Sequence, residues 1–441
     1  MVSDNIKGIE MKTIHEMGIE AKAASIKMAA LSDKVKNRAI LAVAEALERN
    51  ALEIEAANRL DLAAASKLEL PLQKRLKYDS GKIAASIEGL KSLALLPNPV
   101  GITQKATLLD DGLELYRVSC PIGVIGVVFE SRPDALVQIS SLCLKSGNAV
   151  LLKGGSEALN SNRILAKIVL DASVSAGLPD GWLQLLETRA DVSEMLTLDD
   201  CIDLVIPRGS NAFVKYIMEH TSIPVMGHAD GLCHLYVDAA ADAEMAVKLA
   251  VDAKTQYVSV CNAIETLLVH QAKAEEFLPR LTEALKAKKV QMRCCPRSLP
   301  LMPGGIPATE KDWDTEYLDY ILSIKVVDSL DEAVEHINRH GSGHTDAIVT
   351  EDKGAAARFM SLVDSADVFW NCSTRFADGF RFGLGAEVGI ATGKIHARGP
   401  VGLDGLCIYK WLLKGSGQTV APYADGTAHF KHIPLNQNFE I

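Results

Sequence analysis

One cysteine of this chain lies in a stretch whose pattern suits a nucleophile. Cys261 stands in an alternating run, residues 256–262, and an apolar run follows at 263–269. Both patterns predict β-strand, and a thiol held between two ordered segments can be aimed at a reacting atom. The alternative is a cysteine that only packs, because buried cysteine usually behaves as a small, inert hydrophobic residue. The spacing alone leaves both readings open.

A glycine-containing turn offers a second chemical feature. Lys153-Gly154-Gly155-Ser156 follows the strand-like run 149–153, and ligands of open α/β sheets bind beyond the carboxyl ends of the strands. Lys153 supplies a cation, Ser156 a small hydroxyl, and the turn itself carries no acid that would repel a ribose 2′-phosphate. This composition favours a phosphorylated nucleotide. A plain glycine turn with a solvated lysine is the alternative.

The next strand-to-helix turn has a similar composition. Arg208-Gly209-Ser210 follows the short apolar run 204–206. Small residues at such a turn let backbone N–H groups approach an anion at a helix N-terminus. A tight turn without a ligand explains the same residues equally well.

A long stretch with little periodicity, residues 371–405, carries several arginines. Long irregular segments inside a compact chain are usually functional, and arginine binds carboxylates through two parallel hydrogen bonds. In a chain with net charge −10, Arg375 and Arg381 therefore suggest capture of a small anionic substrate. The alternative is that these arginines form internal ion pairs, which we expect at least of Arg398.

Three histidines recur at four-residue spacing, His336, His340 and His344. Such spacing can place zinc ligands on one face of a helix. Gly341 and Gly343 interrupt the helix before the third histidine, so a helix C-terminus with favourably placed cations is the better interpretation. We expect no metal site.

The bulk composition excludes several classes of protein. Excess negative charge argues against nucleic-acid and anionic-lipid surfaces. The nine cysteines form no C-x-x-C pair and are odd in number, which excludes a zinc ribbon and a disulfide framework and favours a reducing, cytoplasmic location. No secretory signal and no membrane-length apolar run is visible.

Strand-like and helix-like segments alternate along most of the chain, which is typical of doubly wound parallel sheets. A first α/β series begins near residue 122 and a second near residue 235; amphipathic helices over 34–50 and 51–66 precede the first. Asp111-Gly112 inside the alternating run 107–118 predicts a two-residue hairpin. The remaining expected elements are helices over 135–145, 160–175, 211–220, 242–253 and 274–286 and strands over 123–129, 183–186, 235–237, 324–327, 347–350 and 406–413.

Taken together, these residues resemble the aldehyde dehydrogenase superfamily and, more narrowly, the family of γ-glutamyl phosphate reductases. The resemblance covers nearly the whole chain and includes long, specific motifs. It implies two doubly wound α/β domains with a small β oligomerisation flap. We expect a cofactor-binding domain over 1–228 interrupted by the ribbon 107–118, a catalytic domain over 229–404, and an oligomerisation segment over 405–441. The stretches that carry the resemblance are 121–134, 153–156, 206–210, 256–262, 313–319, 373–389 and 395–402.

The resemblance implies a role for several residues. Cys261 matches the nucleophile, Lys153 the lysine on the adenosine ribose, and Glu316 the glutamate that holds the nicotinamide ribose. Ser156 matches a position that is glutamate in many NAD-preferring relatives, which agrees with NADPH. Gly209 and Ser210 match the turn beside the diphosphate and the nicotinamide. Because the substrate's carboxylate and phosphate both need cations, the candidates for binding them are Arg132, Arg375 and Arg381; Asn262 is a further candidate for binding the substrate.

Two departures from the wider superfamily bear on mechanism. Hydrolytic members place a glutamate base where this chain reads 225–229 without an acid. Its absence suits a thioester that must survive until it is reduced. The superfamily's oxyanion-binding asparagine aligns near Arg132, so the side-chain donor of the oxyanion hole stays open, and the Cys261 backbone N–H is the expected donor.

The implied reaction is the NADPH-dependent reduction of L-glutamyl 5-phosphate to L-glutamate 5-semialdehyde and phosphate through a Cys261 thioester, the second step of proline biosynthesis from glutamate. The resemblance also implies a homo-oligomer, dimer or tetramer, and transient contact with a glutamate 5-kinase. A CoA-acylating dehydrogenase and a non-catalytic dehydrogenase-like scaffold are the competing readings.

Overall fold

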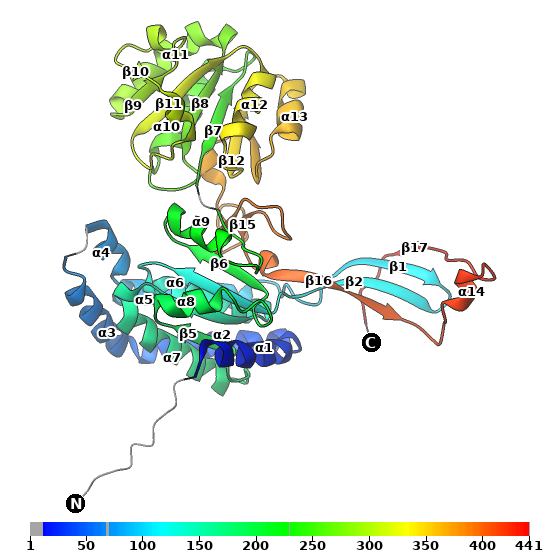
Figure 1. Ribbon diagram of the computed structural model, residues 1–441. Coiled ribbons are helices and arrows are strands. Elements are labelled where there is room, and N and C mark those ends of the chain that lie inside the picture. Colours follow the sequence, from blue (N-terminus) through cyan, green and yellow to red (C-terminus); the bar gives the residue numbers. More distant parts are fainter. Residues whose placement is uncertain (1–11, 68–69, 229, 441) are drawn as a thin grey trace, which may run out of the picture. The chain divides into compact units, whose positions relative to one another are not determined.

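A computed structural model describes residues 12–67, 70–228 and 230–440 (Figure 1). The chain forms two compact units: residues 1–209, 217–225 and 403–441 make the first, and 210–216 and 226–402 the second. The start of the first expected domain, residues 1–11, and the boundary residue 229 lie outside the described residues. In the described part, no helix is both long and apolar enough to span a membrane.

The first unit is built on a four-stranded parallel sheet of order β5-β4-β3-β6. Its inner strands are buried along their length because helices pack against the sheet. The left-handed Gly147, at φ 76°, ends α6 as its position predicts. The strands are β3 Val124–Phe129, β4 Ala149–Lys153, β5 Leu183–Leu186 and β6 Leu204–Arg208; the helices are α1 Ile14–Ala29, α2 Asp33–Arg49, α3 Ala51–Ala64, α4 Leu70–Leu76, α5 Ser80–Leu95, α6 Pro133–Ser146, α7 Leu159–Ser175 and α8 Arg189–Met195.

A second, antiparallel sheet of the first unit has the order β16-β2-β1-β17 (Figure 1). The predicted hairpin is confirmed: Gly112, at φ 69°, turns the chain between β1 and β2, although both strands extend beyond 107–118. The predicted strand at 406–413 is β16, which pairs with β2. These elements are β1 Thr103–Asp110, β2 Leu113–Pro121, β16 Cys407–Lys414, α14 Ala421–Ala424 and β17 Ile433–Leu435.

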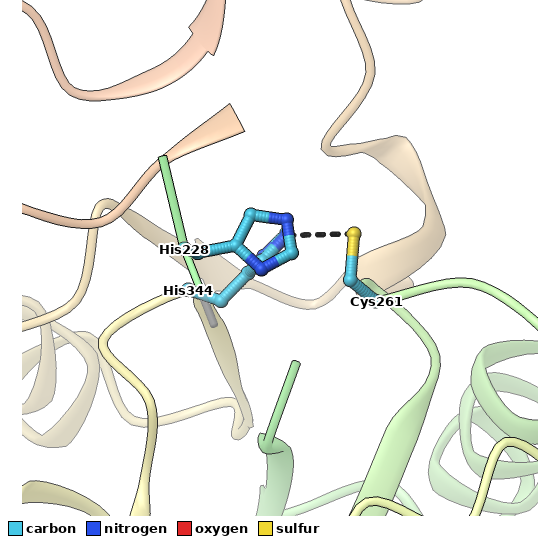
Figure 2. A group of neighbouring side chains, drawn as sticks. All are labelled: His228, Cys261 and His344. Atoms are coloured by element: carbon cyan, nitrogen blue, oxygen red, sulfur yellow. Dashed lines mark hydrogen bonds between the residues drawn. The ribbon is translucent and has the colours of Figure 1, made fainter. Parts of the chain in front are cut away.

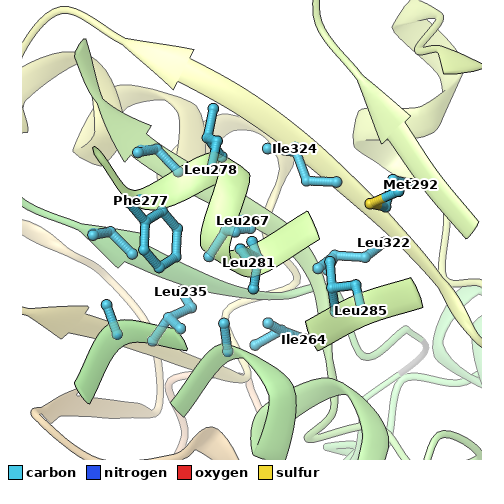
Figure 3. Close-up of a cluster of buried hydrophobic side chains, with 14 of the residues drawn as sticks. Leu235, Ile264, Leu267, Phe277, Leu278, Leu281, Leu285, Met292, Leu322 and Ile324 are labelled. Carbon is cyan, nitrogen blue, oxygen red and sulfur yellow. The ribbon is translucent and has the colours of Figure 1, made fainter. Parts of the chain in front are cut away.

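The second unit contains a seven-stranded parallel sheet of order β10-β9-β11-β8-β7-β12-β13. Alternate residues of its strands enter two apolar clusters, one under α10 and α11 (Figure 3) and one under α12 and α13. Both faces are therefore covered, as in a doubly wound fold. The strands are β7 Cys233–Val237, β8 Ile264–His270, β9 Gln291–Cys294, β10 Ile306–Pro307, β11 Ile321–Val327, β12 Thr345–Val349 and β13 Asp367–Trp370; the helices are α10 Ala243–Thr255, α11 Gln271–Ala287, α12 Leu330–His340 and α13 Lys353–Leu362.

The irregular stretch from residue 371 contains only short elements, among them the hairpin of β14 Gly389–Ala391 and β15 Gly399–Val401. Helix α9, Asn211–Glu219, spans a boundary between the two units. Its first residues cluster with the second unit, whereas we placed all of residues 210–216 in the first domain. The reason is local: Asn211 hydrogen-bonds Glu316 in the second unit.

One predicted strand is wrong. The run 256–262 before Cys261 is not extended: α10 continues to Thr255, the Gln256 N–H still bonds the Asp252 carbonyl as a helix does, and a turn follows. The alternation arises because Val258 packs inward from this turn while Tyr257 and Ser259 face outward. The predicted strand after Cys261 is confirmed as β8.

Candidate active site

Cys261 lies in the turn that enters a central strand of the seven-stranded sheet. Its side chain is partly exposed, whereas the next residue, Asn262, and the first strand residues are buried. The Ala263 N–H donates to the Val260 carbonyl at 3.2 Å and tightens the turn. The thiol is therefore carried by a rigid strand entry and is not part of the apolar core.

The amino ends of neighbouring strands meet around this cysteine. Strands β8, β7 and β12 are adjacent and parallel, so the residues that precede them lie at one edge of the sheet. Cys233, which begins β7, donates its Sγ–H to the Cys261 carbonyl at 3.1 Å. His344, directly before β12, places Nε2 3.1 Å from Cys261 Sγ (Figure 2).

His344 is held on its other side by the neighbouring strands. Its Nδ1 lies 2.7 Å from Thr345 Oγ1, and Thr345 Oγ1 donates to Asp367 Oδ2 at 3.2 Å. The His228 ring packs edge-on against His344 with centroids 5.0 Å apart, and ligand atoms of His228, Cys261 and His344 all lie within 4.8 Å of one another. The three side chains form one compact cluster (Figure 2).

The sequence-based interpretation of the histidines was partly right. Helix α12 ends at His340, which confirms a helix terminus there. However, His344 lies outside the helix and beside the candidate nucleophile, a role that the spacing argument missed. The available signal was a histidine directly before a strand-like apolar run, in the same position as Cys261 before its own strand.

Burial makes the neutral forms of both groups dominant. It raises the pKa of the Cys261 thiol to about 12; Glu316 and Glu387 act in the same direction, and the Arg375 guanidinium opposes them. Burial lowers the pKa of His344 to about 3, with a smaller effect of the same sign from His228. At neutral pH the pair is therefore a thiol facing a neutral imidazole.

Asn262 ties the arginine-bearing loop to the cysteine turn. Its Nδ2 donates to the Ala377 carbonyl at 2.7 Å, and its own carbonyl accepts from Thr374 Oγ1 at 2.7 Å. The buried Asn262 Oδ1 has no hydrogen-bond partner among the described residues. An unpaired buried amide oxygen is costly, so this atom is available to a donor group of a ligand.

The two candidate arginines of this loop differ. Arg375 is buried, and its Nε donates to Gln256 Oε1 at 3.0 Å. Arg381 donates to the Arg375 carbonyl at 2.6 Å and lies 3.7 Å from an Asp378 carboxylate oxygen. Arg381 is thus largely engaged in holding the loop, whereas Arg375 carries a charge close enough to act on Cys261.

Arg398 forms the internal contacts that we expected of it. Its guanidinium bonds the Asp364 carbonyl at 2.8 Å and lies 3.4 Å from that residue's carboxylate. This expectation is confirmed.

Glu316 is a partly buried acid of the second unit. Its Oε2 accepts from Asn211 Nδ2 at 2.7 Å, in the helix that directly follows Ser210. Burial raises the pKa of this carboxyl, and the Asn211 hydrogen bond opposes the rise. The remaining acceptor capacity of the carboxylate suits the hydroxyls of a sugar.

The other candidates for the cofactor lie in the first unit. Lys153 ends β4 and is 9% exposed, burial lowers its pKa, and no described residue accepts a hydrogen bond from its ammonium group. Ser156 and Gly209, each beyond the carboxyl end of a strand, are exposed. A mostly buried cation without a partner fits a ligand phosphate or hydroxyl, so these residues suit a nucleotide.

An acid lies next to the turn of Lys153 and Ser156, contrary to our expectation. Glu157 directly follows Ser156, and its carboxylate accepts hydrogen bonds from the Ser131 N–H, at 2.8 Å, and from the Ser131 hydroxyl. It also attracts Lys153 electrostatically. The turn is therefore not free of acid, and electrostatics alone do not select NADP.

Arg132 belongs to the first unit. It precedes α6 in the first unit, is about half exposed, and pairs with Asp134 at 2.8 Å. Its guanidinium has an internal partner, so it is weaker than Arg375 as a candidate for binding substrate.

Comparisons with known proteins show the family of this chain. Residues 3–296 match the aldehyde dehydrogenase family. The chain is 60% identical to a γ-glutamyl phosphate reductase of Pelotomaculum thermopropionicum, covering 97% of this chain and 99% of that one, and 53% identical to one of Natronomonas pharaonis, covering 93% and 95%. The crystal structure of a Thermotoga maritima γ-glutamyl phosphate reductase matches with a TM-score of 0.90 and 40% identity, over 92% of this chain and 100% of that one.

A wider structural likeness concerns the fold alone. An acetylating aldehyde dehydrogenase of Geobacillus thermoglucosidasius matches with a TM-score of 0.62 at 18% identity, over 94% of this chain and 99% of that one. The chain belongs to the aldehyde dehydrogenase family, with the α/β fold of that family. Within it, the chain belongs to the γ-glutamyl phosphate reductases, which are oxidoreductases.

Proposed function

We propose that this enzyme reduces L-glutamyl 5-phosphate to L-glutamate 5-semialdehyde and phosphate with NADPH, the second step of proline biosynthesis from glutamate. The observation that carries the proposal is the Cys261 thiol, held at a strand entry with His344 Nε2 3.1 Å away. The membership in the family of γ-glutamyl phosphate reductases supports the substrate.

The proposed chemistry is acyl transfer to sulfur followed by reduction. Cys261 Sγ attacks the acyl carbon and phosphate leaves with the bonding electrons, which gives a thioester. NADPH supplies the hydride that reduces this thioester to a thiohemiacetal, and cleavage of the C–S bond then releases the aldehyde. Covalent catalysis of this kind divides one difficult step into easier ones.

Arg375 and Asn262 are the proposed contacts of the anionic substrate in the second unit. Arg375 is buried with one side-chain partner, Gln256, so its terminal nitrogens are suited to a carboxylate or phosphate. The unpaired Asn262 Oδ1 suits the substrate's ammonium group. Arg381 donates a hydrogen bond to the Arg375 backbone carbonyl and so supports Arg375. Arg132 is a weaker candidate because it forms an ion pair with Asp134.

Lys153, Ser156 and Gly209 in the first unit, with Ser210 and Glu316 in the second, are the proposed residues for NADPH. The support is the mostly buried, unpaired Lys153 ammonium and the acceptor capacity of Glu316. The proposed preference for NADPH over NADH rests on the Lys153 cation and on Ser156, which matches a position that is glutamate in many NAD-preferring relatives; the nearby Glu157 carboxylate opposes this preference.

Three further expectations belong to this proposal: a homo-oligomer that uses the β16-β2-β1-β17 sheet, a cytoplasmic location, and transient contact with a glutamate 5-kinase. The first has a structural basis. β16 is an edge strand whose Trp411 and Leu413 are 49% and 60% exposed. Exposed apolar side chains on a free strand edge mark a surface that another chain covers.

The test is the reverse reaction. We expect NADP reduction by glutamate 5-semialdehyde to require inorganic phosphate, because phosphate must cleave the thioester, and we expect Cys261→Ser to abolish it. Phosphate-independent NADP reduction would instead identify a hydrolytic dehydrogenase. Turnover retained by Cys261→Ser would contradict the covalent mechanism.

A further inference from the structure

The hydrogen bonds around His344 define where its proton lies. Thr345 has a single hydroxyl hydrogen, which it donates to Asp367 Oδ2 at 3.2 Å. The Thr345 oxygen lies 2.7 Å from His344 Nδ1 and has no hydrogen left to donate to it, so it accepts a hydrogen bond from Nδ1. The imidazole proton is therefore on Nδ1. Nε2, 3.1 Å from Cys261 Sγ, is then left with its lone pair toward the thiol.

The sheet holds His344, Thr345 and Asp367 in place. His344 and Thr345 are fully buried and Asp367 is 8% exposed. Thr345 faces Asp367 across the parallel pair β12–β13, and the Asp367 N–H donates to the His344 carbonyl at 3.0 Å. The His344 backbone is thus held by Asp367 and its ring by Thr345 Oγ1, which together set the ring orientation that a proton acceptor requires.

We propose that His344 Nε2 is the acceptor of the Cys261 proton, and that Thr345 and Asp367 are positioning residues that hold His344 in the tautomer able to accept it. The proposal rests on the proposed function, because it assigns the activating base of that same nucleophile.

The proton and electron balance closes within the proposed reaction. The Sγ–H bond breaks and the proton moves to Nε2, while sulfur uses the freed electron pair to bond the acyl carbon. The C–O bond to phosphate breaks, phosphate leaves with the electron pair of that bond, and Nε2 passes its proton to the departing phosphate. The hydride of NADPH reduces the acyl carbon, and when the C–S bond later breaks, the thiolate takes up a proton from solvent.

Deprotonation accompanies the attack. The high pKa of the Cys261 thiol and the low pKa of His344, both caused by burial, disfavour a resting thiolate–imidazolium pair. Proton transfer during bond formation avoids that charged intermediate, and a positioned base contributes about 10²–10⁴-fold in such steps.

Asp367 gives this arrangement a dependence on pH. Burial raises the pKa of Asp367 to about 6, and the Thr345 hydrogen bond and the Arg398 charge oppose the rise. Once protonated, Asp367 can donate to Thr345, which then donates to His344 Nδ1 and moves the imidazole proton to Nε2. The groups that face His344 and Cys261 are His228, Glu316, Glu387 and Arg375.

The experiment measures the rate at which iodoacetamide alkylates Cys261, read from the Cys261-containing peptide by mass spectrometry between pH 5 and 8, on the whole enzyme without substrate. Thr345→Val keeps the shape of the side chain and removes the hydroxyl, and Thr345→Ser restores it. We expect Thr345→Val to slow alkylation by about 10-fold or more, less than the full contribution of a base because part of the imidazole keeps the correct tautomer.

Further variants make the outcome decisive. Thr345→Ser should recover most of the alkylation rate, His344→Gln should be at least as slow as Thr345→Val, and Asp367→Asn should remove the inflection near pH 6. Far-ultraviolet circular dichroism and the melting temperature of each variant exclude unfolding. Equal alkylation rates and pH profiles in folded wild type, His344→Gln and Thr345→Val would overturn the proposal.

Different results would refute the role of His344 and the proposed function. If Cys261→Ser abolishes phosphate-dependent NADP reduction while the His344 and Thr345 variants alkylate like wild type, only the role of His344 is refuted. If Cys261→Ser retains turnover, the function itself is refuted, whatever the alkylation rates.

Discussion

Gly231 lies against the backbone of Cys261. A Cβ on Gly231 would come within 2.4 Å of the Cys261 Cα and carbonyl oxygen and 2.6 Å of its Cβ. Backbone atoms cannot rotate away as the end of a flexible side chain can, so only glycine allows the nucleophile its observed position. Gly231 precedes β7 as Cys261 precedes β8, and the close approach follows from the pairing of these strands.

Gly231→Ala is expected to remove nearly all reductase activity because the added methyl group displaces Cys261, and misplacement by about 1 Å costs on the order of 100-fold in rate. The measurement is kcat with saturating substrates. The matched control is Gly393→Ala in the same unit, where an added Cβ meets nothing within 4 Å. Equal losses in the two variants would refute the steric explanation.

Lys153→Met is expected to weaken binding of NADPH by about 10- to 100-fold, since a hydrogen bond to a charged group contributes ~1.5–3 kcal/mol. The methionine fills much of the lysine stem's space, so packing is retained. Fluorescence titration with NADPH and NADH measures the effect without turnover. Lys27→Met, an exposed lysine of the same unit, should bind as wild type; unchanged affinity of Lys153→Met would remove Lys153 from the cofactor site.

The Lys254–Glu265 pair couples α10 to β8 at 2.5 Å, and both side chains are buried. Burial opposes both charges: it lowers the pKa of Lys254 and raises that of Glu265 to about 7. Lys254→Met should leave an unpaired buried carboxyl and lower stability by about 3–5 kcal/mol. The urea midpoint measures this; the double variant Lys254→Met/Glu265→Leu should recover much of the loss, and a double variant as unstable as the single one would contradict the pairing argument.

Glu265 also forms a hydrogen bond with the segment that contains Glu316. Its other oxygen accepts from the Leu318 N–H at 3.2 Å, and Leu318 has a left-handed backbone at φ 52°. We expect Glu265→Gln to raise the Kd of NADPH several-fold while changing the alkylation rate of Cys261 little. Loss of alkylation with unchanged NADPH binding would show that Glu265 acts on the cysteine turn instead.

Trp411→Glu on β16 is expected to reduce the mass of the assembly, because a charge at an apolar edge opposes association. Size-exclusion chromatography with light scattering gives the mass. Leu95→Glu is the control: Leu95 is also apolar and 86% exposed, at the end of α5. If Trp411→Glu has the mass of wild type, the β16 surface is not the interface.

Local sequence patterns were sufficient for most elements. Apolar runs and the Asp111-Gly112 turn placed the strands and the hairpin because strand burial and turn geometry depend on neighbouring residues. The run 256–262 failed because its alternation comes from a turn, and the helix before it is extended by tertiary contacts such as that of Lys254 with Glu265. Cys261, Lys153 and Glu316 were found from motifs that are contiguous in the chain.

The partners of these residues depend on pairings that no local pattern records. His344, Thr345 and Asp367 are separated from Cys261 by about a hundred residues, and they meet because β8, β7, β12 and β13 are successive neighbours in one parallel sheet. The sequence by itself determined the fold class, the family resemblance and the candidate nucleophile, Cys261. Only the tertiary structure decided which histidine faces that cysteine and which residues contact its ring, because strand order brings the amino ends of these strands to one edge of the sheet.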